Sequence, residues 1–516
     1  MKGKISGIIL VASLLTTALA KAQTNAPSSP AGTAEDLRIV TPGSPFGIAW
    51  GFLYGYTGSK AEQFMPQLRG LGAGFTKVYL FWNQIEPRKG QYDWTAVDSF
   101  VGQLKSPDEG LIALFSSSTW AVKKPSAMLP PSAANNPDDY YRFVYDVVKH
   151  CKGRVCYWQN DCEPNDPVYW SGTKEEFVAE LKVFYKAVKD ADPGAVVIVG
   201  GYDGLFNPPG TGTFQFPTQR ASLDFYDYVF AEGRNAFDFF DLRLYADPYT
   251  IVARVDYMRK RMHDLGFDKP IICTEYGGPG LFEFSQNLQY VPLISTWMQS
   301  VQNPGTNGFS SADQSGSNKI SALYAKMSTL APQTQMFMVG CSPELEAKHD
   351  RIQSRDLVMR NVLAFSAGVQ KTLYWDLHND PQPRDNLMTL MYGKIALMDY
   401  AGGTFTKYYP TANAYKIMAK ALAGLRAMKR VPVSGQPSIF LFEADRGDRG
   451  PACVVWQRRD AFSGEDSPAV PFAWAWTAKN ATAIDVLGQT VPVKIADGQM
   501  HLDISLTPIF IEPADE

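Results

Sequence analysis

The sequence contains few of the residues that build metal sites and disulfide scaffolds. Its 516 residues include 6 cysteines and 5 histidines, and no two of the histidines stand at metal-ligand spacing. We therefore expect neither a disulfide-dependent fold nor a metal or other cofactor. Cys151 and Cys156 lie close enough in the sequence to form one disulfide, and a pair of buried free thiols is an equally good interpretation.

The chain also has no excess of positive charge and only one long apolar run, near its start. Its net charge is −3, and it becomes −6 when residues 1–22, which hold three lysines, are removed. An acidic protein is a poor partner for nucleic acid. The run from Ile8 to Leu19 follows Lys2 and Lys4 and is shorter than the ~20 residues that span a bilayer. We expect a signal peptide cleaved near Ala22, which makes the protein secreted or periplasmic without a membrane anchor.

No glycine-rich nucleotide-binding motif follows the first apolar segment, which argues against an open, doubly wound sheet. Instead, short apolar segments alternate with longer segments of helical period, as in repeated βα units. The eight predicted strands cover residues 46–52, 76–82, 111–117, 155–161, 195–201, 240–246, 270–276 and 371–377. Several are apolar almost throughout, which is typical of parallel strands buried on both faces. The sequence therefore predicts an α/β fold, a (β/α)₈ TIM barrel.

The chain is expected to divide into four regions. A flexible linker rich in Ser, Pro, Gly and Ala should follow the signal peptide over residues 23–45, so that ordered structure begins at Phe46. The barrel should occupy residues 46–430 and end in a helix over 412–430. Its largest insertion, residues 281–350, follows the seventh strand and should emerge at the C-terminal face of the barrel.

The pattern changes in the last region, residues 431–516. Short alternating segments separated by Gly, Asp and Pro predict a C-terminal antiparallel β-sandwich-like domain. Ala496-Asp497-Gly498 is a strong signal for a hairpin turn inside it.

Two glutamates stand where predicted parallel strands end, the place where barrels collect catalytic groups. Glu163 follows the fourth strand and Glu275 ends the seventh, and neither has a cationic partner in its own segment. Burying a carboxylate there is costly unless it is paired or has a function. Two carboxylates at a barrel mouth suit acetal hydrolysis, in which one protonates the leaving oxygen and the other attacks the anomeric carbon. Glu163 would then need a raised pKa, whereas Glu275 must stay ionised, for which Tyr245 could donate a hydrogen bond.

At this point the sequence resembles the clan A glycoside hydrolases, which carry an acid/base glutamate in an Asn-Glu-Pro motif after strand four and a nucleophile glutamate at the end of strand seven. Glu163-Pro164 and Glu275 occupy these places. Residues 82–87 (WNQIEP) and 90–94 (GQYDW) are similar to a segment common in that clan. The C-terminal region resembles the small β domain of β-xylosidase and α-L-iduronidase relatives, and the cellulase-like families share the motifs. The resemblance covers residues 46–516 and implies a retaining glycosidase with Glu163 as acid/base and Glu275 as nucleophile.

The resemblance also implies a set of substrate contacts, with two departures. Cys162 replaces the asparagine whose amide binds the sugar 2-hydroxyl, and Arg243 stands where relatives often carry histidine. A thiol is a poor hydrogen-bonding group, so Asn160 or Asn165 would have to take that role. Trp375 looks like the tryptophan beneath the cleaved sugar. The full set of expected substrate-binding residues is Asn160, Cys162, Asn165, Arg243, Tyr245, Trp375, Trp120 and His378.

The functional prediction is a retaining glycoside hydrolase acting on β-glycosidic bonds of an oligo- or polysaccharide, with no nucleic acid partner. A catalytically weakened carbohydrate-binding protein and a transglycosidase are the alternatives on the same fold. Glu86, in the segment after strand two, is expected to brace its loop and not to take part in catalysis. The sequence leaves the sugar, the linkage and the oligomeric state open.

Overall fold

The computed structural model describes residues 38–39, 41, 43–50, 64–202, 219–293, 319–378, 384, 387–401 and 404–514. The expected signal peptide and most of the predicted linker lie outside these residues, as does part of the insertion. Among the helices of the described ranges, none combines the length and the apolar character that a bilayer crossing requires.

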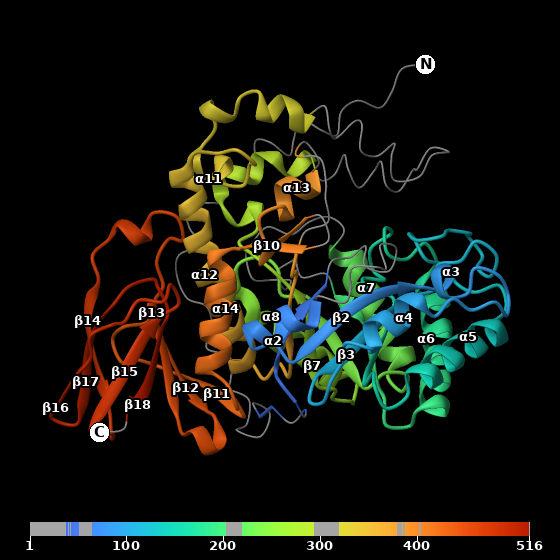
Figure 1. The fold of residues 1–516 in the computed structure, drawn as a ribbon, viewed down its shortest axis with the longest axis horizontal. Coiled ribbons are helices and arrows are strands. Elements are labelled where there is room, and N and C mark those ends of the chain that lie inside the picture. Colours follow the sequence, from blue (N-terminus) through green and yellow to red (C-terminus); the bar gives the residue numbers. More distant parts are fainter. Residues whose placement is uncertain are drawn as a thin grey trace.

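Eight parallel strands close into a barrel, which confirms the predicted fold (Figure 1). Each strand pairs with the next, and β8 pairs with β1 to close the sheet. The strands are β1 (Phe46–Ala49), β2 (Phe75–Phe81), β3 (Glu109–Phe115), β4 (Tyr157–Asn160), β5 (Val196–Tyr202), β6 (Phe239–Leu242), β7 (Ile271–Tyr276) and β8 (Thr372–Tyr374). All eight overlap the segments predicted from the sequence.

Two helices on the outside of the barrel begin at side-chain caps that the sequence encodes. Helix α5 (Pro137–Cys151) starts at Asn136, whose side chain accepts a hydrogen bond from the Asp138 amide. Thr173 and Glu176 form a capping box at the start of α6 (Lys174–Ala191). The remaining helices around the barrel are α2 (Phe64–Leu71), α3 (Trp82–Ile85), α4 (Thr95–Val101), α7 (Gln219–Gly233), η2 (Pro248–Thr250), α8 (Ile251–Asp264), α12 (Pro343–Ser366) and α14 (Pro410–Ala421). Helix α13 (Leu387–Tyr392) lies above the barrel and packs against the insertion.

The alternation of side chains along the strands produces two cores. On β2, Tyr79 and Phe81 face the barrel interior, whereas Val78 and Leu80 face the surrounding helices. The same period of two puts Lys77 inside the barrel, where it is fully buried. Polar residues inside the barrel must therefore find partners there.

The C-terminal β module consists of a five-stranded and a three-stranded antiparallel sheet around their own apolar core. Its strands are β11 (Ala427–Val431), β12 (Ile439–Asp445), β13 (Ala452–Gln457), β14 (Val470–Ala475), β15 (Asn480–Asp485), β16 (Lys494–Ala496), β17 (Gln499–Ile504) and β18 (Ile509–Ala514), with the short turns η6 (Gly447–Arg449) and η7 (Gly464–Asp466). Asp497 and Gly498 both have positive φ between β16 and β17, as a two-residue hairpin requires. The predicted turn is confirmed.

Two sequence expectations fail at the ends of the barrel. The helix predicted over 412–430 ends at Ala421, and β11 instead pairs with β12. Gly424, with φ of 81°, lies in the turn that separates them. Ordered structure also starts before Phe46, because the Ile39 amide donates to the Arg426 carbonyl at 2.8 Å.

The described part of the insertion forms a small apolar cluster above the C-terminal ends of the strands. It contains η3 (Leu281–Glu283), η4 (Ser285–Tyr290), η5 (Met327–Thr329) and α11 (Pro332–Gln335), and it leads into the first turns of α12. A hairpin of β9 (Met398–Ala401) and β10 (Thr404–Tyr408) follows α13.

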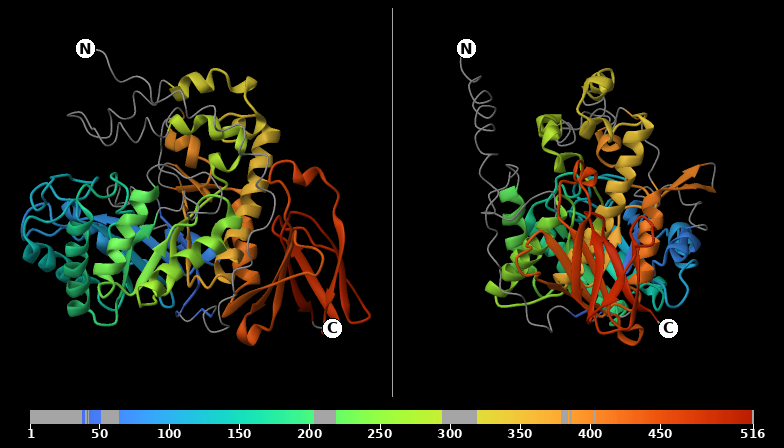
Figure 2. Two further views of the ribbon diagram at one scale, coloured as in Figure 1. Left: turned by 180° about the vertical axis from the view of Figure 1, so that it is seen from behind. Right: turned by 90° about the vertical axis from the view of Figure 1, so that its left-hand side faces the viewer.

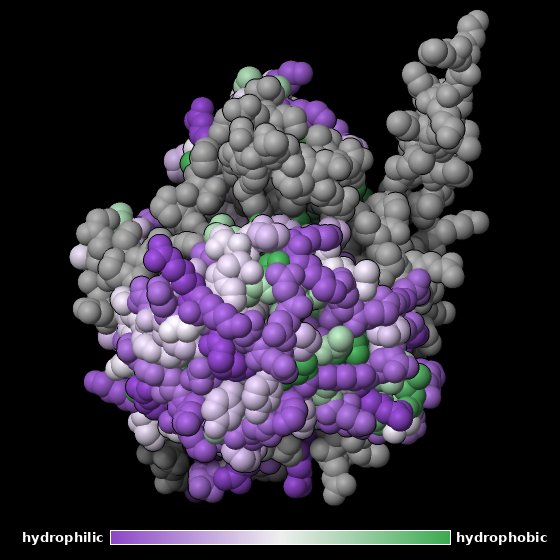
Figure 3. All heavy atoms as spheres, turned by 90° about the vertical axis from the view of Figure 1, so that its right-hand side faces the viewer, coloured by the Kyte–Doolittle hydropathy of each residue, from purple (hydrophilic) through white to green (hydrophobic). Residues whose placement is uncertain are grey.

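Helices α12 and α14 lie between the barrel and the β module (Figures 1 and 2). Arg351 and Arg355 of α12 both bind Glu465 of the module, at 2.8 and 2.6 Å. On the opposite side of the molecule, the surface over the outer barrel helices is mainly hydrophilic (Figure 3).

Candidate active site

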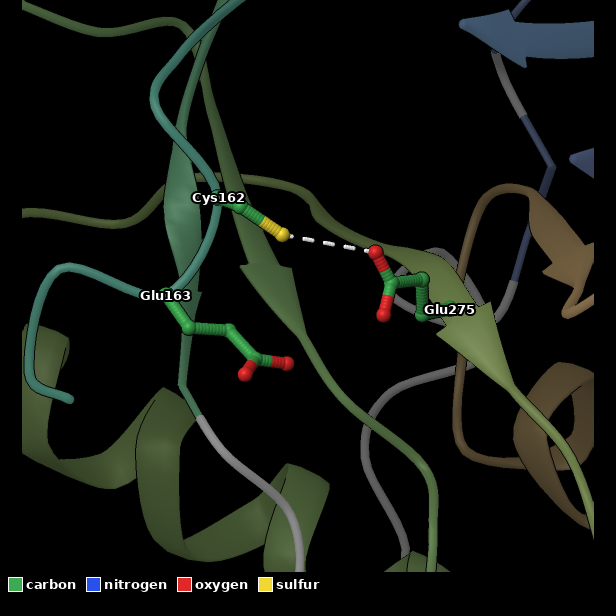
Figure 4. A group of neighbouring side chains, drawn as sticks. All are labelled: Cys162, Glu163 and Glu275. Atoms are coloured by element: carbon green, nitrogen blue, oxygen red, sulfur yellow. Dashed lines mark hydrogen bonds between the residues drawn. The ribbon is translucent and has the colours of Figure 1, made fainter. Parts of the chain in front are cut away.

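The two glutamates at the strand ends converge on one space. Glu163 lies in the loop after β4, next to Cys162, and Glu275 lies near the end of β7. One oxygen of each carboxylate and the Cys162 sulfur all lie within 4.8 Å of one another. Figure 4 shows Cys162 and Glu163 entering this space from one side and Glu275 from the other.

A bulge in β7 turns Glu275 into the barrel mouth. Cys273 pairs with Thr372 and Tyr276 pairs with Tyr374, so β7 has one more residue than β8 between these two points. Cys273 and Tyr276 consequently both belong to the core outside the barrel. The two residues between them, Thr274 and Glu275, both contact the Lys77 ammonium inside it. Without the extra residue, strict alternation would turn one of them outward.

Glu275 accepts most of its hydrogen bonds on one oxygen. Its Oε1 lies 3.2 Å from Lys77 Nζ, 3.1 Å from Arg243 Nη2 and 3.4 Å from Cys162 Sγ, and it also accepts from the Tyr79 hydroxyl. Burial opposes ionisation of this carboxyl, but Arg243 and Lys77 outweigh it and lower the pKa of Glu275 to about 2. Glu275 is therefore a carboxylate at neutral pH.

Arg243, directly after β6, has all three guanidinium nitrogens on protein groups. Nε lies 3.0 Å from Glu163 Oε1, Nη1 lies 2.9 Å from Asp241 Oδ2, and Nη2 lies 2.8 Å from Cys162 Sγ as well as near Glu275. The side chain is fully buried. These contacts place all three nitrogens on protein groups, whereas the sequence suggested a substrate contact for Arg243.

A buried polar network lies beneath the two carboxylates. Asp241 Oδ2 accepts from Gln159 Nε2 at 2.7 Å and from the Thr274 hydroxyl at 2.6 Å, and its Oδ1 accepts from the Thr274 amide. Lys77 Nζ donates to the Thr274 hydroxyl at 3.0 Å. The network ties β2, β4, β6 and β7 together below the site, and such fully bonded groups hold their geometry rigidly.

Three other predicted residues also lie at or near this site. The Tyr245 hydroxyl donates to Glu275 Oε2 at 3.4 Å, as the sequence suggested. Trp375, half-buried at the end of β8, meets the Tyr79 ring edge-on with centroids 5.5 Å apart. Asn165 is half-buried two residues after Glu163 in the same loop.

Asn160 turns away from the site. It is fully buried, and its amide donates to the Tyr140 hydroxyl of α5 at 3.1 Å. Gln159, its neighbour in β4, points inward to Asp241, so the alternation of the strand directs Asn160 outward. Asn160 therefore cannot take over the sugar contact that Cys162 leaves open.

Trp120 and His378 pack into other parts of the molecule. The Trp120 indole donates to the Glu86 carbonyl at 3.1 Å, which places it against the loop after β2. The ring of His378 packs against Phe64 and Tyr400, with centroids 5.2 and 5.3 Å apart. None of these contacts involves Glu163 or Glu275.

Lys77 and Tyr79, the two partners of Glu275 from β2, were not predicted from the sequence. A lysine inside a mainly apolar seven-residue strand is the signal that could have revealed them, because a buried ammonium needs an anionic partner. Tyr79 lies two residues further along the strand and so faces the same way. Which anion they meet depends on how β2 and β7 face each other across the barrel.

The three ligand-type atoms of Cys162, Glu163 and Glu275 are close enough to hold a metal ion. Arg243, however, contacts all three groups, and Lys77 contacts Glu275. A divalent cation would be placed beside two fixed positive charges and would have to displace them. Burial also raises the pKa of the Cys162 thiol well above its ordinary value, so the thiolate that binds metals is disfavoured. Cys162, Glu163 and Glu275 are therefore better suited to contact the Arg243 guanidinium than to bind a metal ion.

Many solved structures share the fold of this chain, among them three glycoside hydrolases or glucanases. A family 39 glycoside hydrolase from the gut symbiont Bacteroides cellulosilyticus WH2 is 14% identical with a TM-score of 0.57, and the match covers 94% of this chain and 82% of that one. AbfB, a family 51 α-L-arabinofuranosidase from Bifidobacterium longum, is 10% identical with a TM-score of 0.54, covering 95% and 98%. CelM2, a bifunctional glucanase-xylanase protein from a metagenome library, is 11% identical with a TM-score of 0.51, covering 93% and 98%.

No protein-family model matches the sequence, and neither does any curated protein. The solved structures therefore agree with the clan A resemblance at the level of the fold. At such low identities, activity has to be argued from the site itself.

Proposed function

We propose that this protein is a glycoside hydrolase that cleaves β-glycosidic bonds of an oligo- or polysaccharide by double displacement with retention. The observation that carries the proposal is the approach of the Glu163 and Glu275 carboxylates, with one oxygen of each within 4.8 Å. Retaining enzymes place these groups roughly 5–5.5 Å apart, whereas inverting enzymes leave about 6.5–9.5 Å for a water molecule. The shared fold of solved glycoside hydrolases supports the same interpretation.

The contacts of Glu275 suit a nucleophile. Among the residues that the structure describes, its Oε1 accepts hydrogen bonds from Lys77, Tyr79 and Cys162 and forms an ion pair with Arg243, whereas its Oε2 accepts a hydrogen bond from Tyr245 alone. Oε2 is therefore the oxygen that attacks the anomeric carbon. Glu163 donates its proton to the leaving oxygen in this step, and Glu275 becomes esterified to the sugar. Glu163 then removes a proton from water, which attacks the anomeric carbon and releases Glu275.

The two alternatives, a carbohydrate-binding protein and a transglycosidase, can be distinguished from a hydrolase by the fate of a bound sugar. A panel of aryl β-glycosides together with β-glucans, xylans and galactans should contain a compound that the protein hydrolyses. Proton NMR should show that the first sugar formed is the β-anomer. A first-formed α-anomer contradicts retention, and binding without turnover points to a carbohydrate-binding protein. Transfer of the sugar to an added sugar acceptor in preference to water indicates a transglycosidase.

The proposal includes secretion and independence from metals. The N-terminal sequence is the support for secretion, and mass spectrometry of the protein expressed in a bacterium with a periplasm should show a mature chain that starts after Ala22. Extended treatment with EDTA should leave hydrolysis unchanged, because Arg243 and Lys77 supply the positive charge beside Glu275.

A further inference from the structure

Arg243 links the two carboxylates of the site to each other. Its Nε contacts Glu163 Oε1 at 3.0 Å, and its Nη2 contacts Glu275 Oε1 at 3.1 Å. Its third nitrogen, Nη1, is held by Asp241 at 2.9 Å from below. Lys77, a second buried cation at the site, contacts Glu275, whereas Arg243 contacts both Glu163 and Glu275. A planar guanidinium holds two carboxylates at once in fixed directions, whereas the three donors of an ammonium rotate and do not fix such an arrangement.

The backbone of β5 makes room for this arrangement. A side-chain carbon on Gly201 would lie 2.7 Å from Arg243 Nε and 2.8 Å from Asp241 Oδ2. One on Gly200 would lie 2.8 Å from the Cys162 carbonyl oxygen, at the start of the loop that carries Glu163. The two glycines therefore allow the guanidinium and the Glu163 loop to pack directly against the strand.

The charges around the site need a shared cation. Glu163, Glu275 and Asp241 bring three carboxyl groups to the same guanidinium. In the buried interior any two of these groups that are ionised together repel each other strongly, and a single permanent positive charge between them reduces that repulsion. With all three nitrogens on protein groups, Arg243 is poorly placed to bind a sugar or an acidic substituent.

We propose that Arg243 is a positioning residue that fixes the spacing of Glu163 and Glu275 and keeps Glu275 ionised, and that it does not bind substrate. The catalytic consequence rests on the proposed glycosidase function. The structural consequence does not, because it concerns the state of Glu275 in the free protein. The two can therefore be tested separately.

Several groups face Glu275 and contribute to its titration. They are Lys77 and Tyr79 from β2, Cys162, Glu163 and Tyr169 from the β4 segment and its loop, and Arg243 and Tyr245 from the end of β6. Burial raises the pKa of Glu275, and Arg243 makes the largest contribution that lowers it. Removing the guanidinium should therefore raise the pKa of Glu275 toward or above the ordinary value for a glutamate.

The first experiment needs no substrate. In protein labelled with ¹³C at the glutamate carboxyl carbon, the Glu275 signal is identified by its loss in Glu275→Gln. In the unmodified protein this signal should not titrate above about pH 4. In Arg243→Gln, which keeps a polar side chain without charge, it should titrate at a clearly higher pH. An unchanged titration in Arg243→Gln overturns the proposal.

Arg243→Lys carries the test if the Gln variant does not fold. An ammonium cannot reach both carboxylates and Asp241 together, so the Glu275 signal should still move to higher pH. The matched control is Arg446→Lys in the β module, which alters a buried arginine that contacts Glu512 at 2.8 Å. It should leave the Glu275 titration unchanged.

The second experiment uses the aryl glycoside that the protein hydrolyses fastest. Arg243→Ala should lower kcat by about 10²-fold or more with little change in KM, because the substrate contacts remain while the reacting groups are misplaced. Guanidinium ion at non-denaturing concentration should restore part of the lost kcat. A raised KM with kcat preserved would show that Arg243 binds substrate and would overturn the proposal. If no glycoside is hydrolysed, the glycosidase function fails while the titration still decides the role of Arg243.

Discussion

Glu163 and Glu275 each bring one carboxylate oxygen to within 4.8 Å of the other, from the loop after β4 and from a bulge in β7. Neither residue has a charged partner in its own segment, and both meet the same guanidinium of Arg243 in the folded protein. The site is therefore a product of the barrel closing, which brings the ends of β4, β6 and β7 together.

Glu275→Gln should abolish hydrolysis and leave the fold intact. The amide cannot attack the anomeric carbon, so turnover of aryl glycosides should fall by about 10⁴-fold or more. Circular dichroism should show an unchanged fold. The matched control is Glu109→Gln at the start of β3, which loses a buried ion pair with Lys371 and should keep its turnover. Normal hydrolysis by Glu275→Gln would remove Glu275 from the mechanism.

Glu163→Ala should slow substrates according to their leaving groups. A glycoside with a poor leaving group needs a proton on the departing oxygen, so its rate should fall by about 10²–10⁴-fold. The nitrophenolate of an activated nitrophenyl glycoside departs without that proton, so the rate of the first step should fall much less for this substrate. Steady-state and burst kinetics on both kinds of substrate provide the measurement. An equal loss on both would argue against Glu163 as the acid.

The strands of the barrel could be predicted because they are short apolar segments. Glu163 and Glu275 could be predicted as site residues because they stand at the ends of such segments. The bulge in β7 has no counterpart in the sequence pattern, since it exists only in the register against β8. Two partners of Glu275, Lys77 and Tyr79, were missed for a related reason. Both come from β2, and their contacts with Glu275 depend on which side chains meet inside the closed sheet.

Asn160 and the helix expected over 412–430 differ from the predictions for similar reasons. Asn160 was expected at the substrate because it lies near Glu163, but the alternation of β4 directs it to Tyr140. The helix predicted over 412–430 continued through residues that pair with β12. Both errors came from local sequence position, which tertiary packing overrides.

A buried pair of carboxyl groups behind the β4 loop should make stability depend on pH. Burial raises the pKa of Glu180 to about 8, and it also raises the pKa of Asp161, which lies beside the Glu163 loop. Above pH 4.5 the unfolded chain releases the Glu180 proton while the folded protein retains it until about pH 8, so stability should fall across this range.

Glu180→Gln tests that dependence because the amide cannot ionise. The difference in Tm between Glu180→Gln and the unmodified protein should increase in favour of the variant as the pH rises from about 5 to about 8. Its turnover per folded molecule should be preserved, since Glu180 bonds to the Ala134 amide and lies outside the catalytic pair. Parallel Tm curves would contradict the raised pKa.

Glu86 should contribute to stability and not to catalysis. It is fully buried and accepts hydrogen bonds from Trp82 Nε1 at 2.8 Å, from the Gly90 amide at 2.5 Å and from Arg142 Nη2 at 2.7 Å. Glu86→Ala should lower the free energy of unfolding by about 1–3 kcal/mol, measured by urea denaturation, because buried donors lose their acceptor. A large loss of kcat without a loss of stability would instead place Glu86 in the catalytic machinery.

The central claim is that Glu275 forms a covalent bond to the sugar while Glu163 moves the proton. A panel of activated 2-deoxy-2-fluoro-β-glycosides forms the glycosyl-enzyme and slows its breakdown, so the labelled residue can be identified by peptide mass spectrometry. We predict a label of one fluoro-sugar on Glu275, absent in Glu275→Gln. A label on any other residue, or a protein that hydrolyses the parent glycoside but accumulates no label with the whole panel, would contradict the account.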